Sequence, residues 1–71
     1  MSAWPSSKAR RVFAAILRIG WTVKAEKGSS HKQMQHPQWG EATWAFHGSE
    51  EIGPKMIARL AKVFHFTPSD L

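Results

Sequence analysis

The sequence contains no cysteine, which excludes disulfide bonds, thiolate metal sites and the reactions of a catalytic thiol. A chain without cysteine suits a reducing compartment, so we expect a cytoplasmic protein. Long hydrophobic runs are also missing, because the apolar stretch from Val12 to Leu17 is interrupted by Arg18. We therefore expect neither a signal peptide nor a membrane-spanning segment. No serine lies in a nucleophile-elbow pattern, and no glycine-rich phosphate loop precedes a helix.

Acidic residues are scarce: five stand against ten lysines and arginines, which gives a formal net charge of +5. The first twenty residues carry no acid and four cations, namely Lys8, Arg10, Arg11 and Arg18. A basic surface on a small protein typically attracts the phosphate backbone of a nucleic acid. An anionic membrane, an acidic protein partner or simple solubility would also explain this charge.

The length of 71 residues predicts one domain spanning residues 1–71, with residues 1–5 poorly ordered. A domain of this size buries only roughly 60% of the surface that its unfolded chain exposes. Most large apolar side chains are therefore needed for the core, and we assign Trp21 and Trp44 to it. Trp4 is either a packing anchor or part of a disordered segment.

The first expected helix covers residues 7–19, with Ser6 or Ser7 as its N-cap and Gly20 as its left-handed stop. Its apolar residues recur at helical spacing: Ala9, Val12, Phe13, Ile16 and Leu17. Lys8, Arg11 and Arg18 share the opposite side of this helix.

A second helix is expected after Gly53, its N-cap, and Pro54, its first residue, with Ile52 packing onto Ile57 as a hydrophobic staple. Its apolar stripe comprises Met56, Ile57, Leu60, Ala61 and Phe64. The pair Thr67 and Pro68 predicts a short final turn.

Between the helices, three segments alternate apolar and polar residues as strands do: residues 21–26, 31–36 and 42–46. In the first of them, Trp21, Val23 and Ala25 are expected to share one buried face. Turns are expected at residues 27–30 and 37–40. Met34 and Trp44 must share the core side, and a loop centred on residue 39 would place His31 directly across from His47.

This order predicts an α+β, two-layer fold, in which both helices cover one face of a three-stranded antiparallel sheet. The other face is left uncovered. It would display Thr22, Lys24, His31, Gln33, Gln35, Thr43 and His47.

The four histidines are the principal candidates for chemistry. His31 begins an exposed strand, where its side chain is both positioned and reachable. His36 precedes Pro37 and is expected to bond the turn backbone, whereas His65 is expected to complement the carbonyl groups at the end of the second helix. His31 and His36 would face opposite sides of their strand, so we expect no metal site and no cofactor.

Four groups of residues form a recognisable pattern: Gly20-Trp21, the turn and histidine at residues 27–31, Met34-Gln35-His36-Pro37 and Phe46-His47. On these residues the chain bears a resemblance to the HicA family of toxin ribonucleases that covers nearly its whole length. The resemblance continues through Glu51-Ile52 into the second helix, residues 56–64. The family's fold is similar to a double-stranded-RNA-binding domain, and that helix, three-strand, helix order agrees with the order that the periodicity predicts.

The resemblance implies that the chain cleaves messenger RNA and that His31 is catalytic. A neutral imidazole could take the proton of the ribose 2′-hydroxyl while that oxygen attacks the adjacent phosphorus, which requires no metal. His47 could donate the leaving-group proton, or it could only orient substrate or bond Ser49. The resemblance also implies a HicB-like antitoxin that covers His31.

The chain departs from the family's usual pattern at three places. Lys32 stands where a second histidine often follows the catalytic one, Gln38-Trp39-Gly40 replaces an Asp-Gly turn, and Ala45 replaces a proline.

Residues expected to bind RNA are Lys8, Arg11, Arg18, Lys24, Lys27, Lys32 and Gln33. Trp39 could stack on a base or be buried against a partner protein. Two other functions remain open: a non-catalytic double-stranded-RNA-binding module, and an adaptor whose basic helix docks an acidic protein.

Overall fold

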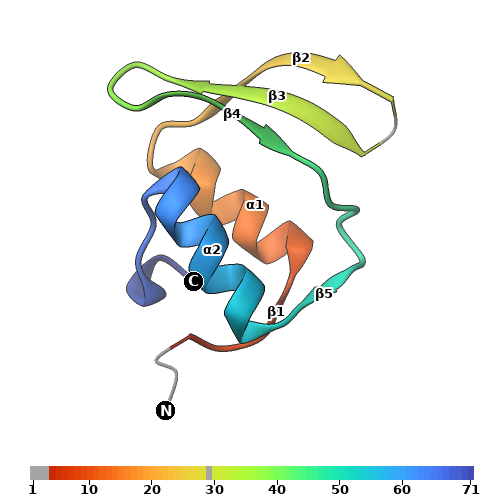
Figure 1. Cartoon of the computed structure of the whole chain (residues 1–71), viewed down its shortest axis with the longest axis vertical. Coiled ribbons are helices and arrows are strands. Elements are labelled where there is room, and N and C mark those ends of the chain that lie inside the picture. Colours follow the sequence, from red (N-terminus) through yellow and green to blue (C-terminus); the bar gives the residue numbers. More distant parts are fainter. Residues whose placement is uncertain (1–3, 29) are drawn as a thin grey trace.

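The computed structural model describes residues 4–28 and 30–71, and the rest of the chain, residues 1–3 and Ser29, lies outside the described residues. Part of the segment expected to be poorly ordered and part of the expected turn at 27–30 are thus not described. Figure 1 shows the elements in chain order: β1 (Ser7–Lys8), α1 (Ala9–Arg18), β2 (Thr22–Lys27), β3 (His31–His36), β4 (Gly40–Trp44), β5 (Glu51–Ile52), α2 (Pro54–Phe64) and the 3-10 turn η1 (Pro68–Asp70).

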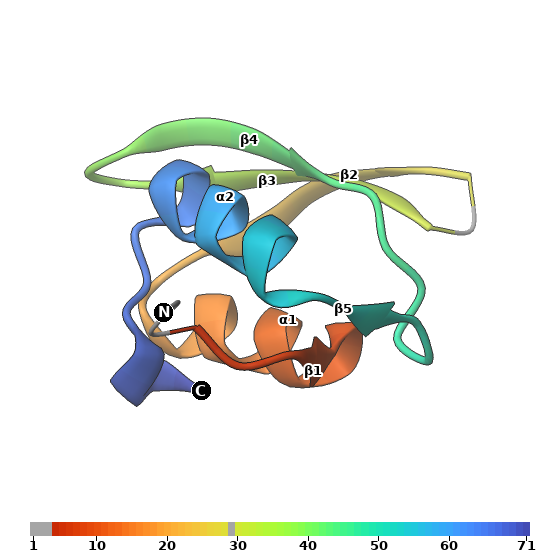
Figure 2. The ribbon, with the colours of Figure 1, turned by 60° about the horizontal axis from the view of Figure 1, so that its bottom comes forward.

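The predicted α+β, two-layer fold is confirmed. Strands β2, β3 and β4 form an antiparallel sheet in that order, and α1 and α2 both lie on one side of it (Figure 2). The opposite side of the sheet is not covered by any helix of the described chain, and we call it the open face. A second, two-stranded pairing joins β1 to β5, where Ser7 lies opposite Ile52.

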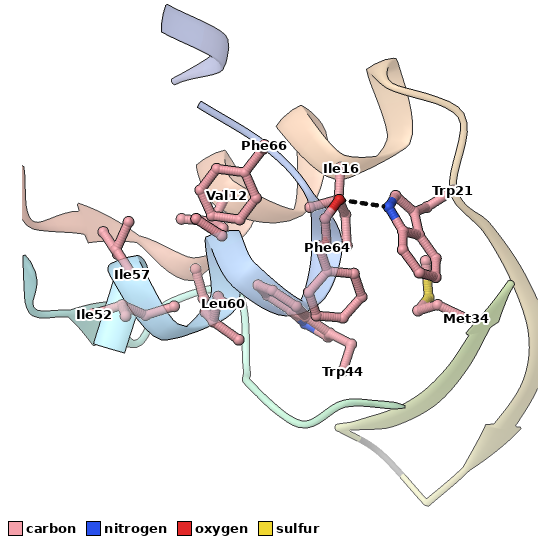
Figure 3. Close-up of a cluster of buried hydrophobic side chains, with 12 residues drawn as sticks. Val12, Ile16, Trp21, Met34, Trp44, Ile52, Ile57, Leu60, Phe64 and Phe66 are labelled. Atoms are coloured by element: carbon pink, nitrogen blue, oxygen red, sulfur yellow. Dashed lines mark hydrogen bonds between the residues drawn. The ribbon is translucent and has the colours of Figure 1, made fainter. Parts of the chain in front are cut away.

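The core fills the space between the helices and the sheet, as Figure 3 shows. Trp21 and Trp44, assigned to the core from the sequence, are 1% and 2% exposed. The Trp21 indole donates a hydrogen bond of 2.9 Å to the carbonyl of Phe64, so its buried N–H is satisfied. Trp4, the first described residue, packs edge-on against Phe66 at a centroid distance of 5.7 Å.

Helix α1 begins differently from the prediction. Neither Ser6 nor Ser7 is its N-cap; Lys8 occupies that position without a side-chain cap. The first amides of the helix donate instead to carbonyls of a distant loop. The amide of Ala9 donates to the carbonyl of Glu50, and the amide of Arg10 donates to the carbonyl of Gly48. Backbone carbonyls can satisfy these free amides as well as a serine hydroxyl can. No serine cap is therefore needed, and Ser7 belongs to β1 instead. The predicted left-handed residue Gly20 is confirmed, with a φ of 113°.

Helix α2 begins as predicted, with Gly53 as N-cap and Pro54 in its first turn. Ile52 and Ile57 are both buried in the core, as the staple requires. Met56 was assigned to the apolar stripe but is 38% exposed, and Leu17 on α1 is 43% exposed. Each lies at the margin of its helix's apolar stripe, where it only partly faces the core.

Strand β2 carries a β-bulge between Val23 and Ala25 that the alternation did not predict. Before the bulge Val23 pairs with Met34 on the helix side, although Val23 is 40% exposed. After it, Ala25 pairs with Gln33 and therefore lies on the open face, since directly opposed residues share a face. The prediction of a continuous buried side through Ala25 is wrong.

The register between β3 and β4 also differs from the prediction. His36 pairs with Gly40 around a three-residue turn at 37–39, and Lys32 pairs with Trp44. Gly40 has a φ of 88°, the left-handed conformation that a three-residue hairpin turn requires after its last residue. This turn shifts the pairing by two residues, which keeps Met34 and Trp44 on the core side but removes His47 from its predicted place opposite His31.

Candidate active site

His31 is the first residue of β3, and its exposed side chain projects from the open face. This orientation follows from the strand, because Met34 is fully buried toward the helices and alternate residues face opposite sides. Among the residues that the structure describes, none forms a hydrogen bond, ion pair or ring contact with the His31 imidazole that would fix its ring nitrogens. The imidazole is therefore available to a ligand from solvent.

Lys27 is the cross-strand partner of His31 and shares its face. The bulge in β2 produces this pairing. Residues 25–27, between the bulge and the turn, face the side of the sheet opposite to the one that uninterrupted alternation would give them. Strand β4 ends opposite Lys32, so at His31 the sheet is only two strands wide. His31 therefore stands at a corner of the sheet, with a cation on one side and no paired strand on the other.

A polar network occupies the open face farther along the sheet. The carboxylate of Glu41 accepts hydrogen bonds from Lys24 at 2.7 Å and from Gln33 at 3.1 Å. Thr43 donates in turn to the amide oxygen of Gln33 at 3.0 Å. The hydrogen bond from Lys24, followed by that from Gln33, lowers the pKa of Glu41 below its ordinary value. Glu41 was not among the residues predicted for this face, although alternation back from Trp44 places it there together with Thr43.

His47 lies in the exposed segment after β4. Continued by one pair, the observed register would bring Ala45, and not His47, across from His31. The carbonyl of His47 accepts a hydrogen bond from the amide of Glu50 at 3.0 Å, which holds the backbone of this segment. The predicted juxtaposition of the two imidazoles in a paired register is therefore wrong.

The other predicted cations do not gather around His31. Lys8 lies 3.7 Å from the carboxylate of Glu51, and Arg11 donates a hydrogen bond of 2.9 Å to the carbonyl of Leu71. Arg18 bonds the carbonyl of Asp70. Lys32 lies on the helix side of the sheet, where its ammonium is 5.8 Å from the centre of the Phe13 ring. Of the predicted RNA-binding residues, only Lys24, Lys27 and Gln33 share the open face with His31.

His36 and Trp39 belong to a stack of rings at the far end of the hairpin. The His36 ring accepts a hydrogen bond from the amide of Gln38 on Nδ1, so Nε2 carries the proton that is donated to the carbonyl of Ile19. This confirms that His36 bonds the turn backbone. Trp39 lies between two imidazoles, 4.1 Å from the ring of His36 and 4.4 Å from that of His65. Trp39 is thus already stacked and only 36% exposed.

A hollow of about 180 Å³ opens on the helix side, between the start of α1, the start of β3 and the end of β4. Aromatic rings and two cations line it, together with small residues; the lining consists of Ala9, Arg10, Phe13, Lys32, Trp44, Phe46 and Gly48. The sequence alone does not reveal this hollow, because its residues come from three separate parts of the chain.

Residues 4–28 and 30–71 include no cluster of three or more histidine, cysteine or carboxylate side chains that could hold a metal ion. Neither helix of the described chain combines the length and the apolar character needed to cross a membrane.

Comparison with known proteins gives one family. The family model described as the HicA toxin of bacterial toxin-antitoxin systems matches residues 9–64, from the first residue of α1 to the last residue of α2. Searches of curated proteins and of solved structures gave no significant match. The match covers most of the 71 residues and both layers of the fold. The chain therefore belongs to the HicA family of toxins of toxin-antitoxin systems.

Proposed function

We propose that this toxin is an endoribonuclease that cleaves messenger RNA without a metal ion, with His31 as the general base. The observation that carries the proposal is the position of His31, exposed on the open face beside the cation Lys27 and bound to no other described side chain. A general base must be reachable by the proton that it removes, and a cation must lie near the phosphate that receives charge.

In the proposed reaction, a ring nitrogen of His31 takes the proton of a ribose 2′-hydroxyl. The 2′-oxygen forms a bond to the adjacent phosphorus, and the bond from phosphorus to the 5′-oxygen of the next nucleotide breaks. The departing oxygen takes a proton from water, which leaves a 2′,3′-cyclic phosphate and a 5′-hydroxyl. Because RNA supplies the nucleophile, the protein needs only a base and positive charge. Lys27 would stabilise the charge that develops on the phosphate oxygens.

Membership of the family also means that this toxin has an antitoxin partner. We propose that the antitoxin is HicB-like and covers His31, which would keep cytoplasmic messenger RNA out of the corner of the sheet. Because His31 is exposed and stands where β4 has already ended, a partner could cover it without unfolding the sheet.

Cleavage of RNA in the presence of a chelator tests the proposal. His31→Ala should lower the cleavage rate by roughly 10²- to 10⁴-fold, the usual contribution of a general base. The melting temperature should stay unchanged, because the imidazole packs against no core residue. His47→Ala is the matched control and should retain most of the activity, since His47 lies outside the paired register.

Normal cleavage by the His31→Ala variant would show that the base lies elsewhere. If the unaltered protein leaves RNA intact but binds it tightly, the RNA-binding module becomes the better interpretation. If the unaltered protein binds no RNA but does bind an acidic protein, the adaptor becomes the better interpretation.

A further inference from the structure

The hollow on the helix side has no part in the proposed cleavage step. We propose that it binds one nucleotide of a single-stranded RNA, adjacent to the nucleotide that is cleaved, with the base on its aromatic wall and the phosphate on its two cations. This inference rests on the proposed ribonuclease function, because it concerns how the same substrate is held.

The aromatic wall consists of three rings, in which Trp44 contacts both Phe13 and Phe46. The Phe13 and Trp44 rings are 5.3 Å apart at their centroids, and the Trp44 and Phe46 rings are also 5.3 Å apart. Phe13 and Phe46 are only partly buried, so part of each ring remains accessible to a ligand. The indole N–H of Trp44 is already donated to the carbonyl of Phe46 at 3.1 Å. The wall can therefore stack a base but offers no side-chain donor from Trp44 to identify it.

Two cations complete the hollow, and no acidic residue lines it. Lys32 extends over the ring of Phe13, and Arg10 belongs to the first turn of α1. Neither side chain is engaged in a salt bridge with any residue of the described parts of the chain. A flat apolar wall next to two unneutralised cations suits a ligand that is aromatic at one end and anionic at the other, as a nucleotide is.

The position of the hollow relative to His31 also favours RNA. Lys32 and His31 are consecutive residues whose side chains lie on opposite faces of β3. Strand β4 has ended at this point, since its last residue, Trp44, pairs with Lys32. A flexible strand of RNA can therefore turn around this corner, with one nucleotide at His31 and a neighbour in the hollow. A hollow of about 180 Å³ is smaller than the roughly 300–1,000 Å³ of sites that enclose drug-sized ligands, so it can take the base of one nucleotide while the sugar and phosphate stay at its mouth.

Binding of a 2′-O-methyl RNA hexamer tests this inference without cleavage, because the modified sugar has no nucleophilic hydroxyl. Lys32→Gln and Phe13→Leu should each weaken binding, measured by fluorescence anisotropy, by about tenfold, the order expected for losing a stacked base or a phosphate contact. Lys62→Gln, which removes an exposed cation on α2, is the matched control and should have little effect. In an NMR titration, the indole N–H signal of Trp44 should shift on addition of the hexamer.

Lys32→Gln removes no core side chain, so it tests the inference even if Phe13→Leu lowers stability. The inference is overturned if both variants bind the hexamer like the control and the Trp44 signal stays in place, whether or not the protein cleaves RNA. It is also overturned if the variants keep RNA affinity but lose affinity for the antitoxin, which would make the hollow a protein-docking site. Should the hexamer bind in the hollow while unmodified RNA stays intact, the proposed cleavage fails but this binding site stands.

Discussion

Gly20 combines a backbone conformation and a close contact that both depend on its lack of a side chain. Its φ is 113°, and a Cβ atom there would lie 2.8 Å from Nε2 of His36. That nitrogen donates to the carbonyl of Ile19, so the ring cannot move away without losing its hydrogen bond. The turn after α1 and the end of β3 are thus fixed to one another.

We predict that Gly20→Ala lowers the free energy of unfolding by about 2 to 4 kcal/mol, from backbone strain and the loss of the His36 hydrogen bond together. Gly28→Ala separates the two causes, because Gly28 also has a positive φ, 76°, but no atom within 4 Å of the added Cβ. That control should cost only about 1 kcal/mol. Urea unfolding measures both, and equal losses would contradict the role of the contact.

At the residue scale, the sequence predicted the positions of Gly20, His36 and the core tryptophans, since each follows from a local pattern. It did not predict that Arg11 and Arg18 would bond carbonyls of the last residues, because nothing in the first helix indicates where the end of the chain lies. The exposure of His31 was an expectation from its place at the start of a strand, and the structure agrees with it.

At the scale of elements, the β3–β4 hairpin is joined to the end of α2 by the stack of His36, Trp39 and His65. His65 can reach the stack because it ends α2 in the left-handed conformation, with a φ of 63°. The tip of the hairpin is held by this stack and by the hydrogen bond from His36 to the carbonyl of Ile19, so we expect the stack to influence how often the tip opens.

Trp39→Ala should therefore speed amide hydrogen exchange at residues 36–40 and lower stability by about 1 kcal/mol, the order of a stacked aromatic pair. Trp39→Phe keeps a ring between the two imidazoles and should restore most of the protection. Exchange that is equally slow in all three proteins would show that the stack does not hold the tip.

At this scale, the sequence predicted the long elements but not how the strands pair. Both helices and all three long strands were predicted within a few residues, because each has a full period of its pattern. The register was wrong by two residues, since it depends on whether the turn has three residues or five. Gly40 could either follow a three-residue turn or lie inside a five-residue turn. The bulge in β2 has no glycine or proline to mark it, and β1 and β5 have two residues each, too few for periodicity.

For the whole molecule, the positive charge is divided between two sides. Lys8, Arg11 and Arg18 are held by the chain's own oxygens, whereas Lys27 stands beside His31 on the open face. The sequence predicted the fold class, the family and the excess of positive charge. It could not show which cations are already neutralised or hydrogen-bonded, because their partners come from distant parts of the chain.

We predict that Lys27→Gln weakens binding of the 2′-O-methyl RNA and reduces the slope of log affinity against log salt by about 0.7, the value for one contact to a single strand. Arg18→Gln should change that slope less, because its guanidinium bonds the carbonyl of Asp70. Anisotropy titrations at several salt concentrations measure both. A larger effect of Arg18→Gln would place the phosphate contacts near Arg18, at the end of α1, and not beside His31.

The first amides of α1 are bound by carbonyls of Gly48 and Glu50, almost forty residues later. A helix of ten residues is marginal by itself in water. During synthesis, therefore, the part of the toxin made first has no stable helix until the loop that completes it has left the ribosome. Folding of α1, and of the part of the core that it covers, should therefore follow synthesis of this loop and not precede it.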